Sequence, residues 1–243
     1  MELKIIGYWG GYPGVDGASS TYIISKNDFH LVMDIGSGGL CKLQKYVNVT
    51  DINAVILSHY HADHIADVGV LQQSLLVQSF LTENVRTVPI YGHKENEQAF
   101  HRLTDDFTEA VGYDPNNTLK IGPFFIRFLR TKHSVPCFGM RITDGNSTIV
   151  YTADSAYQDE WFKFSKDADL LLAEANFYKG QDAAKSGHMT SEEVGNIAKN
   201  ADVKEVILTH LPHFGEHAQL VEETKEVFTG PVTLAYEGLT WSK

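Results

Sequence analysis

The heptapeptide SHYHADH, residues 58–64, follows the apolar run AVIL and places three histidines and a carboxylate within seven residues. The apolar run predicts a buried strand, and the ligand-rich segment then stands at the end of that strand. A metal ion needs ligands on more than one side. The segment therefore constrains the fold, because other parts of the chain must bring further ligands to the same strand end.

Three other apolar, strand-like runs also end on a potential metal ligand. They are IRFLRTKH, TIVYTAD and VILTH, which end at His133, Asp154 and His210. Strand ends along one edge of a sheet lie close together, so ligands that are far apart in sequence can converge there. The four runs together predict a metal centre at a sheet edge.

The types of residue suit a pair of ions. We predict seven ligands: His59, His61, Asp63, His64, His133, Asp154 and His210. The first two histidines would share one ion with His133, the Asp-His pair would share a second ion with His210, and Asp154 would bridge both. Imidazole and carboxylate ligands suit Zn²⁺, our first choice, and also Mn²⁺ or Fe. Two ions roughly 3.5 Å apart can share a hydroxide and lower its pKa towards about 7, which predicts hydrolysis.

Length and composition narrow the class of protein. The 243 residues suffice for one large domain, and no linker or charge block divides them, so we predict a single domain over residues 1–243. Two cysteines and the lack of a signal-peptide pattern predict a cytoplasmic protein. No run approaches the roughly 18 apolar residues of a membrane span, so no membrane partner is expected. The net charge of −11 weighs against a broad electrostatic grip on nucleic acid.

Strand-like and helix-like segments alternate through both halves, which predicts an α/β protein. We expect strands at Leu3–Tyr8, Thr21–Ser25, Phe29–Asp34 and within 121–133, 146–154, 203–210 and 231–238. The apolar span 68–81 predicts a buried helix, and a homodimer interface is the alternative interpretation. Thr190 and Glu193 fit a capping box at the start of another helix. We expect a last helix whose one face carries Leu220, Val221, Thr224, Val227 and Phe228.

Other candidate residues are assigned simpler roles. Asp34, in DIGSGG, is expected to organise its loop and not to bind metal. Cys137 with His133 could form a nucleophilic pair, but Pro136 between them and the metal interpretation disfavour it. Five histidines without a comparable setting are predicted to be surface residues: His30, His93, His101, His213 and His217.

These motifs resemble a known family. SHYHADH resembles the HxHxDH signature of the metallo-β-lactamase fold, and the resemblance covers nearly the whole chain. TKHSVPCFGMRI resembles the third-histidine segment of the ribonuclease Z-like branch, YTADS its bridging-aspartate motif and LTHLP its last histidine. The chain also resembles the short bacterial hydrolases of the YhfI group. The resemblance implies a four-layer αβ/βα sandwich with a dinuclear centre. True β-lactamases usually place Arg at position 64 and Cys at position 154, so antibiotic hydrolysis is disfavoured.

SGHMTSEEVGNIA resembles the HST segment of ribonuclease Z, whose histidine helps to protonate the leaving oxygen. The resemblance implies that His188 is a general acid, and we count Asp63 with it as catalytic. AEANFYKG departs from the HEATF pattern of that family, which leaves the role of Glu174 open. The long arm that clamps transfer RNA is missing, because only a β-hairpin fits between His133 and Asp154.

Three alternative functions follow. The first is a phosphodiesterase that acts on a small phosphodiester or nucleotide, such as a cyclic nucleotide, by metal-bound hydroxide attack with His188 as the acid. Ser19, Ser20 and Ser155 would hold the phosphoryl oxygens. The second is a transfer RNA 3′-processing endoribonuclease, which the missing arm and the acidic charge disfavour, so large RNA is not an expected partner. The third is a carboxylic-ester or lactone hydrolase that uses the same centre.

Overall fold

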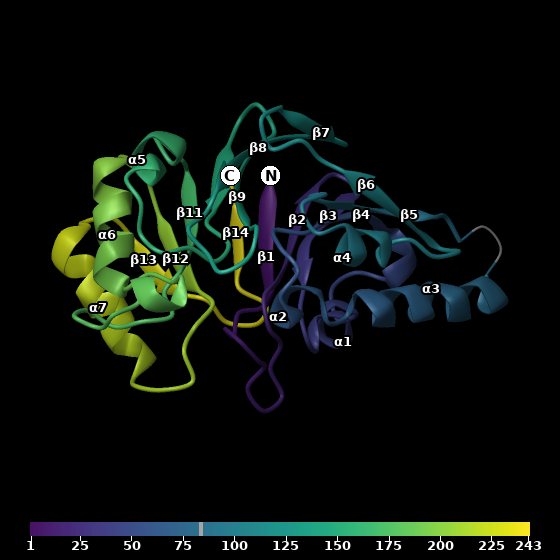
Figure 1. Cartoon of the computed structure of the whole chain (residues 1–243), viewed down its shortest axis with the longest axis horizontal. Coiled ribbons are helices and arrows are strands. Elements are labelled where there is room, and N and C mark those ends of the chain that lie inside the picture. Colours follow the sequence, from purple (N-terminus) through teal and green to yellow (C-terminus); the bar gives the residue numbers. More distant parts are fainter. Residues whose placement is uncertain (83–84) are drawn as a thin grey trace. The chain divides into compact units, whose positions relative to one another are not determined.

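The computed structural model describes residues 1–82 and 85–243. The chain forms two compact units, of which unit 1 comprises residues 1–114 and 236–243 and unit 2 comprises residues 115–235. Each unit is built on one seven-stranded mixed sheet (Figure 1). The predicted α/β class is confirmed, and the predicted single domain stays a prediction.

The sheet of unit 1 has the strand order β14-β1-β2-β3-β4-β5-β6. Its strands are β1 (Glu2–Gly7), β2 (Thr21–Lys26), β3 (Phe29–Ile35), β4 (Ile52–Ile56), β5 (Val88–Gly92), β6 (Thr108–Gly112) and β14 (Thr240–Ser242). The helices are α1 (Gly39–Leu43), α2 (Ala62–Ile65), α3 (Val68–Leu81) and α4 (Glu97–His101), with a 3₁₀ turn, η1 (Val49–Asp51). Strands β3 to β6 run parallel, so their carboxyl ends share one edge, and the ligand segment 58–64 follows β4.

The end of the chain returns to unit 1. Strand β14 pairs antiparallel with β1, with Glu2 opposite Ser242, and the amino group of Met1 donates to the carbonyl oxygen of Lys243 at 2.9 Å. The two chain ends therefore lie together (Figure 1). The sequence analysis did not predict β14, because three residues are too short to show a strand period.

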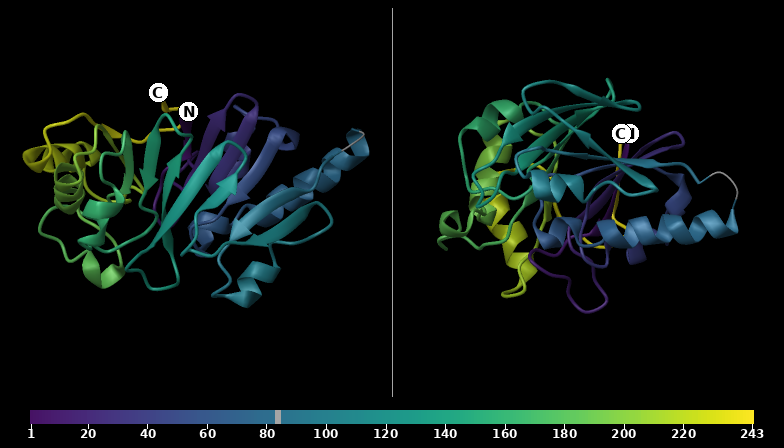
Figure 2. Two further views of the ribbon diagram at one scale, coloured as in Figure 1. Left: turned by 90° about the horizontal axis from the view of Figure 1, so that it is seen from above. Right: turned by 45° about the vertical axis from the view of Figure 1, so that its right-hand side comes forward.

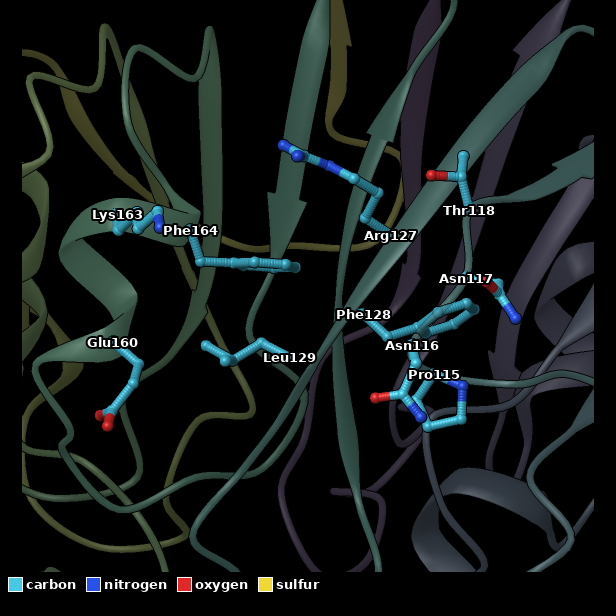
Figure 3. Close-up of a pocket in the computed structure, with 10 residues that line it drawn as sticks. All are labelled: Pro115, Asn116, Asn117, Thr118, Arg127, Phe128, Leu129, Glu160, Lys163 and Phe164. Atoms are coloured by element: carbon cyan, nitrogen blue, oxygen red, sulfur yellow. The ribbon is translucent and has the colours of Figure 1, made fainter.

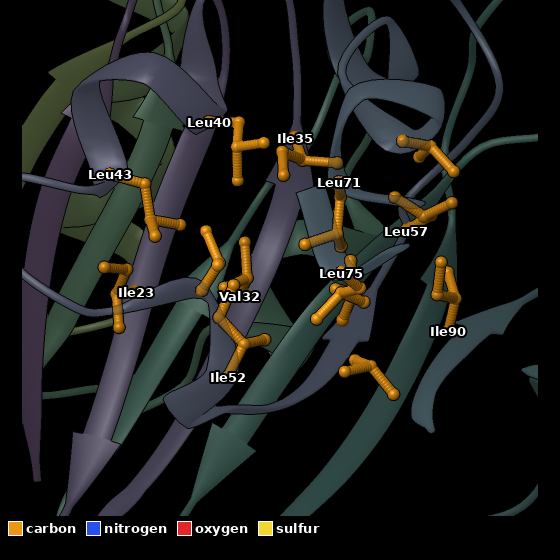
Figure 4. Packing of buried hydrophobic residues seen from close by; sticks show 14 of the residues in the cluster. Ile23, Val32, Ile35, Leu40, Leu43, Ile52, Leu57, Leu71, Leu75 and Ile90 are labelled. Atoms are coloured by element: carbon orange, nitrogen blue, oxygen red, sulfur yellow. The ribbon is translucent and has the colours of Figure 1, made fainter. Parts of the chain in front are cut away.

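Helix α3 supplies one side of the hydrophobic core of unit 1. Its Leu71 and Leu75 are fully buried in a cluster with sheet residues such as Val32 and Ile52 (Figure 4). Each buried leucine contributes about 1.5–3 kcal/mol of transfer free energy. The helix lies along one side of the strands (Figure 2), so only one face reaches the core. The predicted bounds of this helix are correct, but the helix is buried along one face only. The exposed face carries Val70, Val77, Phe80 and Leu81.

The sheet of unit 2 has the strand order β13-β12-β11-β10-β9-β8-β7. Its strands are β7 (Leu119–Ile121), β8 (Phe124–Arg130), β9 (Phe138–Thr143), β10 (Thr148–Tyr151), β11 (Leu170–Glu174), β12 (Val206–Thr209) and β13 (Val232–Leu234). The helices are α5 (Glu160–Phe164), α6 (Ser191–Asn200) and α7 (His217–Val227), with a 3₁₀ turn, η2 (Ala184–Ser186). The predicted hairpin between His133 and Asp154 is present, because β9 and β10 pair antiparallel.

Helix α6 begins at the predicted capping box. The Thr190 hydroxyl accepts from the N–H of Glu193, and the Glu193 carboxylate accepts from the N–H of Thr190 at 2.8 Å. This pair satisfies two backbone donors that the first turn leaves open. It also fixes the chain two residues after His188.

No helix within residues 1–82 and 85–243 is long and apolar enough to cross a membrane.

Candidate metal centre

In unit 1, a buried carboxylate organises the ligand segment. Asp34, near the end of β3, accepts hydrogen bonds from the N–H of Ser58 at 2.7 Å and from its hydroxyl at 2.8 Å. This carboxylate also contacts Nδ1 of His64, at 2.8 Å. Asp34 therefore organises the strand end that follows β4, a wider role than the loop role predicted for it.

These contacts define which nitrogen of each imidazole can bind a metal. The carboxylate of Asp34 only accepts, so Nδ1 of His64 carries the proton and Nε2 keeps its lone pair. The Ser58 hydroxyl donates its hydrogen bond to Asp34. The Ser58 oxygen therefore accepts a hydrogen bond from Nδ1 of His59 at 3.0 Å. Nε2 of His59 then also keeps its lone pair. Such outer hydrogen bonds to a ligating histidine are typical of metal sites.

In unit 2, the predicted ligands lie at one edge of the sheet. Strands β10, β11 and β12 are parallel, and β8 runs in the same direction because β9 is antiparallel to both of its neighbours. His133 follows β8, Asp154 follows β10 and His210 follows β12. The spacing argument from the sequence is correct for these three residues.

Asp154 lies between two imidazoles. Its Oδ1 is 3.4 Å from Nε2 of His210, and its Oδ2 is 3.7 Å from Nε2 of His133. Each carboxylate oxygen thus faces a different histidine. This is the arrangement expected of a carboxylate that bridges two ions.

The distances within each unit fit metal coordination. Two nitrogen ligands, each about 2.0–2.1 Å from a tetrahedral ion, lie roughly 3.3 Å apart. In unit 1, Nε2 of His59 is 3.1 Å from Nδ1 of His61, and Nε2 of His64 is 3.5 Å from Oδ2 of Asp63. Asp63 also accepts from the N–H of Gly11 at 2.8 Å. The donor types and their spacing therefore fit divalent metal ions.

His133 is held by a turn that comes much later in the chain. Its Nδ1 donates to the carbonyl oxygen of Gly187 at 3.0 Å, which leaves Nε2 facing Asp154. Gly187 has a φ of +76°, and a Cβ at this position would lie 2.8 Å from Nδ1 of His133. Glycine is therefore required here both for the backbone angle and for the close approach of the turn.

His188 forms a pair with Glu174, the last residue of β11. Its Nδ1 is 2.9 Å from Oε1 of this fully buried carboxylate, which also accepts from the N–H of Ser155 at 3.0 Å. The ring of His188 stacks on that of His210 at 5.3 Å and lies 5.4 Å from the ring of His133. The sequence analysis left Glu174 open. The run LLLAE was the available signal, because it also ends on a carboxylate at the carboxyl end of a strand.

Backbone strain accompanies the candidate ligands in both units. Asp34, Ala153 and His210 have φ values of 51°, 50° and 51°. A left-handed conformation in a residue other than glycine costs on the order of 1–3 kcal/mol and persists where the surrounding structure imposes it. Here it turns the chain directly at the strand ends that carry the candidate site.

Other predicted residues have mixed outcomes. Ser19 and Ser20 are buried, and their hydroxyls have no hydrogen-bond partner within the part of the chain that the structure describes. The hydroxyl of Ser155 donates to the carbonyl oxygen of Ala156 at 2.6 Å. A substrate role for these serines stays a prediction.

Cys137 is buried, which argues against a nucleophilic role. His93 is not a surface residue as predicted, because it is 2% exposed and packs on Tyr60.

Comparisons with known proteins agree with the resemblance. Residues 40–211 match a family model described as "Beta-lactamase superfamily domain". The sequence is 50% identical over 242 residues to "Probable metallo-hydrolase YhfI" of Bacillus subtilis, with 99% of both chains covered. It is 22% identical over 302 residues to "Ribonuclease Z" of Metallosphaera sedula, with 99% of this chain and 98% of the relative covered.

Solved structures support the same fold. The crystal structure of the metallo-β-lactamase fold protein YhfI from Bacillus subtilis matches with a TM-score of 0.98 at 49% identity, covering 99% of this chain and 98% of that one. The short form of human tRNase Z matches with a TM-score of 0.80 at 21% identity, covering 100% of this chain and 99% of that one. The predicted metallo-β-lactamase fold is confirmed.

Proposed function

We propose a specific function on the premise that this chain belongs to the beta-lactamase superfamily and is a metallo-hydrolase. The proposed activity is hydrolysis of small phosphodiesters, with cyclic nucleotides as the best single candidate. The proposed cofactor is a pair of divalent ions, with zinc as the first choice. The seven predicted ligands would hold the ions. The predicted cytoplasmic location stays a prediction.

The ligand geometry within each unit supports the metal assignment. Each candidate imidazole nitrogen lies 3.1–3.7 Å from another donor of the set, as ligands around a shared ion do. When bound, divalent ions supply Lewis-acid activation of the phosphoryl group and of the attacking water. The two oxygens of Asp154, each directed at a different histidine, support a bridging role.

The pair of His188 and Glu174 is the observation that carries the choice of phosphodiesters. A phosphodiester with a poor leaving group needs a proton at the leaving oxygen. Glu174 accepts a hydrogen bond from Nδ1–H of His188 and so fixes the imidazole ring. Protonated His188 can then donate its Nε2 proton to the leaving oxygen. Since Glu174 is itself held by the N–H groups of Ser155 and Asn176, the ring is positioned before substrate binds.

The small size of the proposed substrate rests on two observations. Only the β9–β10 hairpin separates His133 from Asp154, so this interval presents no arm for a large RNA. The chain has 20 Lys and Arg against 31 Asp and Glu, and a long polyanion needs many cationic contacts. A transfer RNA endonuclease remains the second candidate, because ribonuclease Z proteins are among the relatives.

Replacement of His188 tests the proposed acid. We expect His188→Ala to keep its metal content and to lose roughly 10²-fold or more in turnover of diesters with poor leaving groups. The loss should be smaller for bis(p-nitrophenyl) phosphate, whose leaving group needs little protonation. His101→Ala, at an exposed site on α4, is the control and should match the wild type. Equal losses on good and poor leaving groups would contradict an acid role.

Substrate panels separate the alternatives. At physiological salt, we expect turnover of small diesters and little cleavage of precursor transfer RNA. Efficient trimming of the RNA without turnover of any small diester would support the endonuclease instead. Faster hydrolysis of p-nitrophenyl acetate than of bis(p-nitrophenyl) phosphate would support the carboxylic-ester or lactone hydrolase.

A further inference from the structure

A second feature of unit 2 lies beside His133. A cavity of about 470 Å³ is bordered by the segment after β8, the segment after β10 and the turn η2 that precedes His188. His133 itself lines the cavity, and so does Gly187, whose carbonyl oxygen holds the His133 ring. A molecule in this cavity would therefore contact the edge that carries the candidate metal ligands of unit 2.

The charge of this cavity is opposite to that of the chain as a whole. Lys132 and Lys185 line it, and no carboxylate does. Both lysines are exposed, and neither ammonium group has a hydrogen bond or an ion pair to any residue of the described ranges. In a chain with a net charge of −11, two such uncompensated cations next to a catalytic edge attract an anion.

Ser134, Ser186 and Tyr157 also line the cavity, and each serine carries a hydroxyl that can donate a hydrogen bond to an anion. Partial burial, followed by a hydrogen bond to Asp159, raises the pKa of Tyr157 to about 12, so the phenol stays protonated at neutral pH. Two ammonium groups and two serine hydroxyls match the oxygens of a phosphate better than those of a neutral group.

These donors are separate from the proposed metal ligands. The two proposed metal ions would already neutralise the charge of the reacting phosphoryl group. A cyclic mononucleotide carries no other charged group. We propose that the cavity binds a second, terminal phosphate of the substrate, with Lys132 and Lys185 as the residues that determine this specificity. Among the small phosphodiesters proposed above, a short linear diester with a terminal phosphate would then bind more tightly than a cyclic mononucleotide, which lacks this group. The inference rests on the proposed phosphodiesterase function, and the volume lies within the usual range for small ligands.

Two matched dinucleotides that differ only in a 5′-terminal phosphate test this proposal. For the wild type, we expect KM to be about tenfold lower for the phosphorylated dinucleotide, with a similar kcat, because a remote contact acts equally in the ground and transition states. The double variant Lys132→Ala/Lys185→Ala should lose this preference. Its turnover of bis(p-nitrophenyl) phosphate and its melting temperature should stay at wild-type values.

A control variant distinguishes binding in the cavity from a general electrostatic effect of the protein's charge. Lys163→Ala/Lys199→Ala makes the same change of charge elsewhere in unit 2. Lys163 lines a different cavity of about 350 Å³, together with Arg127 and Phe164 (Figure 3). We expect this control to keep the preference. The proposal is overturned if the wild type shows no preference, if the Lys132/Lys185 variant keeps it, or if the control loses it as well.

Calorimetric binding of the same dinucleotides keeps the two proposals distinguishable. If the protein cleaves no diester, the proposed function fails. The cavity assignment then still stands if the wild type, but not the Lys132/Lys185 variant, binds the phosphorylated dinucleotide more tightly. Equal binding of both dinucleotides by the wild type overturns it. Cleavage of both dinucleotides with equal KM would support the phosphodiesterase proposal and would contradict a role of the cavity in substrate binding.

Discussion

The two units provide their candidate ligands in different ways. In unit 1, all four lie within residues 59–64, and one buried carboxylate, Asp34, organises the segment. In unit 2, His133, Asp154 and His210 come from the ends of three strands, and different residues, Gly187 and Asn176, hold His133 and His210. The first set is a single short segment, held from outside by Asp34 and by the N–H of Gly11. The second depends on the register of a whole sheet.

This contrast predicts where single substitutions act most strongly. Asp154 should be the most sensitive position, because each of its oxygens faces a different histidine. We expect Asp154→Ala to lower the metal content of the purified protein from about two ions per chain to one or fewer. Diester turnover should fall by roughly three orders of magnitude, about 4 kcal/mol of barrier. Measurement of metal content by elemental analysis, with a folded circular dichroism spectrum, provides the check. Two ions retained would refute the bridging assignment.

The second-largest effect should come from Asp34. Asp34→Asn removes one carboxylate oxygen that orients both Ser58 and His64. Loss of such an outer partner typically lowers metal affinity or activity by 10–100-fold. We expect a drop of this size in metal affinity, measured by competition with a chelator. Asp28→Asn, at the exposed turn between β2 and β3, is the matched control. An unchanged affinity would mean that the segment 58–64 holds its ligands without Asp34.

Structure could be predicted from the sequence where a local rule determines it. The carboxyl ends of parallel strands must share an edge, so the positions of His133, Asp154 and His210 followed from the runs that precede them. The capping box at Thr190 followed from hydrogen bonds within four residues. Both rules need only short stretches of chain.

Contacts between distant segments were not predictable in the same way. The carbonyl oxygen of Gly187 that holds His133, and the left-handed φ that brings it there, leave no pattern in the sequence. The role of Glu174 was left open because its segment departs from the family motif. The outer face of α3 carries Val77 and Phe80, and apolar composition alone could not show that these residues are exposed.

The third prediction concerns this distant contact. Gly187→Ala places a methyl group 2.8 Å from Nδ1 of His133 and forces a non-glycine residue to a φ of +76°. We expect a decrease of about tenfold in kcat, since small displacements of catalytic groups are costly. Gly180→Ala also has a positive φ, of +82°, but its Cβ would meet no atom within 4 Å, so this variant controls for backbone strain alone. Equal losses in both variants would show that strain, and not His133, is responsible.

The smallest effect should come from a buried carboxylate of unit 2 that serves the fold. Glu223, on α7, accepts from the N–H of Lys179 at 2.8 Å, from the amide of Gln219 at 2.7 Å and from the hydroxyl of Ser191. Burial raises its pKa, but these hydrogen bonds outweigh burial, and the net pKa is lowered from 4.5. Because the folded pKa is the lower one, ionised Glu223 stabilises the protein above pH 4.5, and this contribution is lost as the pH falls through the folded pKa.

Glu223→Gln should therefore lower the unfolding free energy by about 1–2 kcal/mol at pH 7 and flatten the loss of stability below pH 4.5. Urea unfolding from pH 3 to pH 7 provides the measurement, and Glu222→Gln, on the same helix, is the control. Metal affinity should not change, in contrast to Asp34→Asn. The two carboxylates would then have different roles: Asp34 positions metal ligands, and Glu223 joins α7 to the start of α6. A fall in metal affinity for Glu223→Gln would instead show that the packing of these helices sets the positions of the strand ends that carry Asp154 and His210.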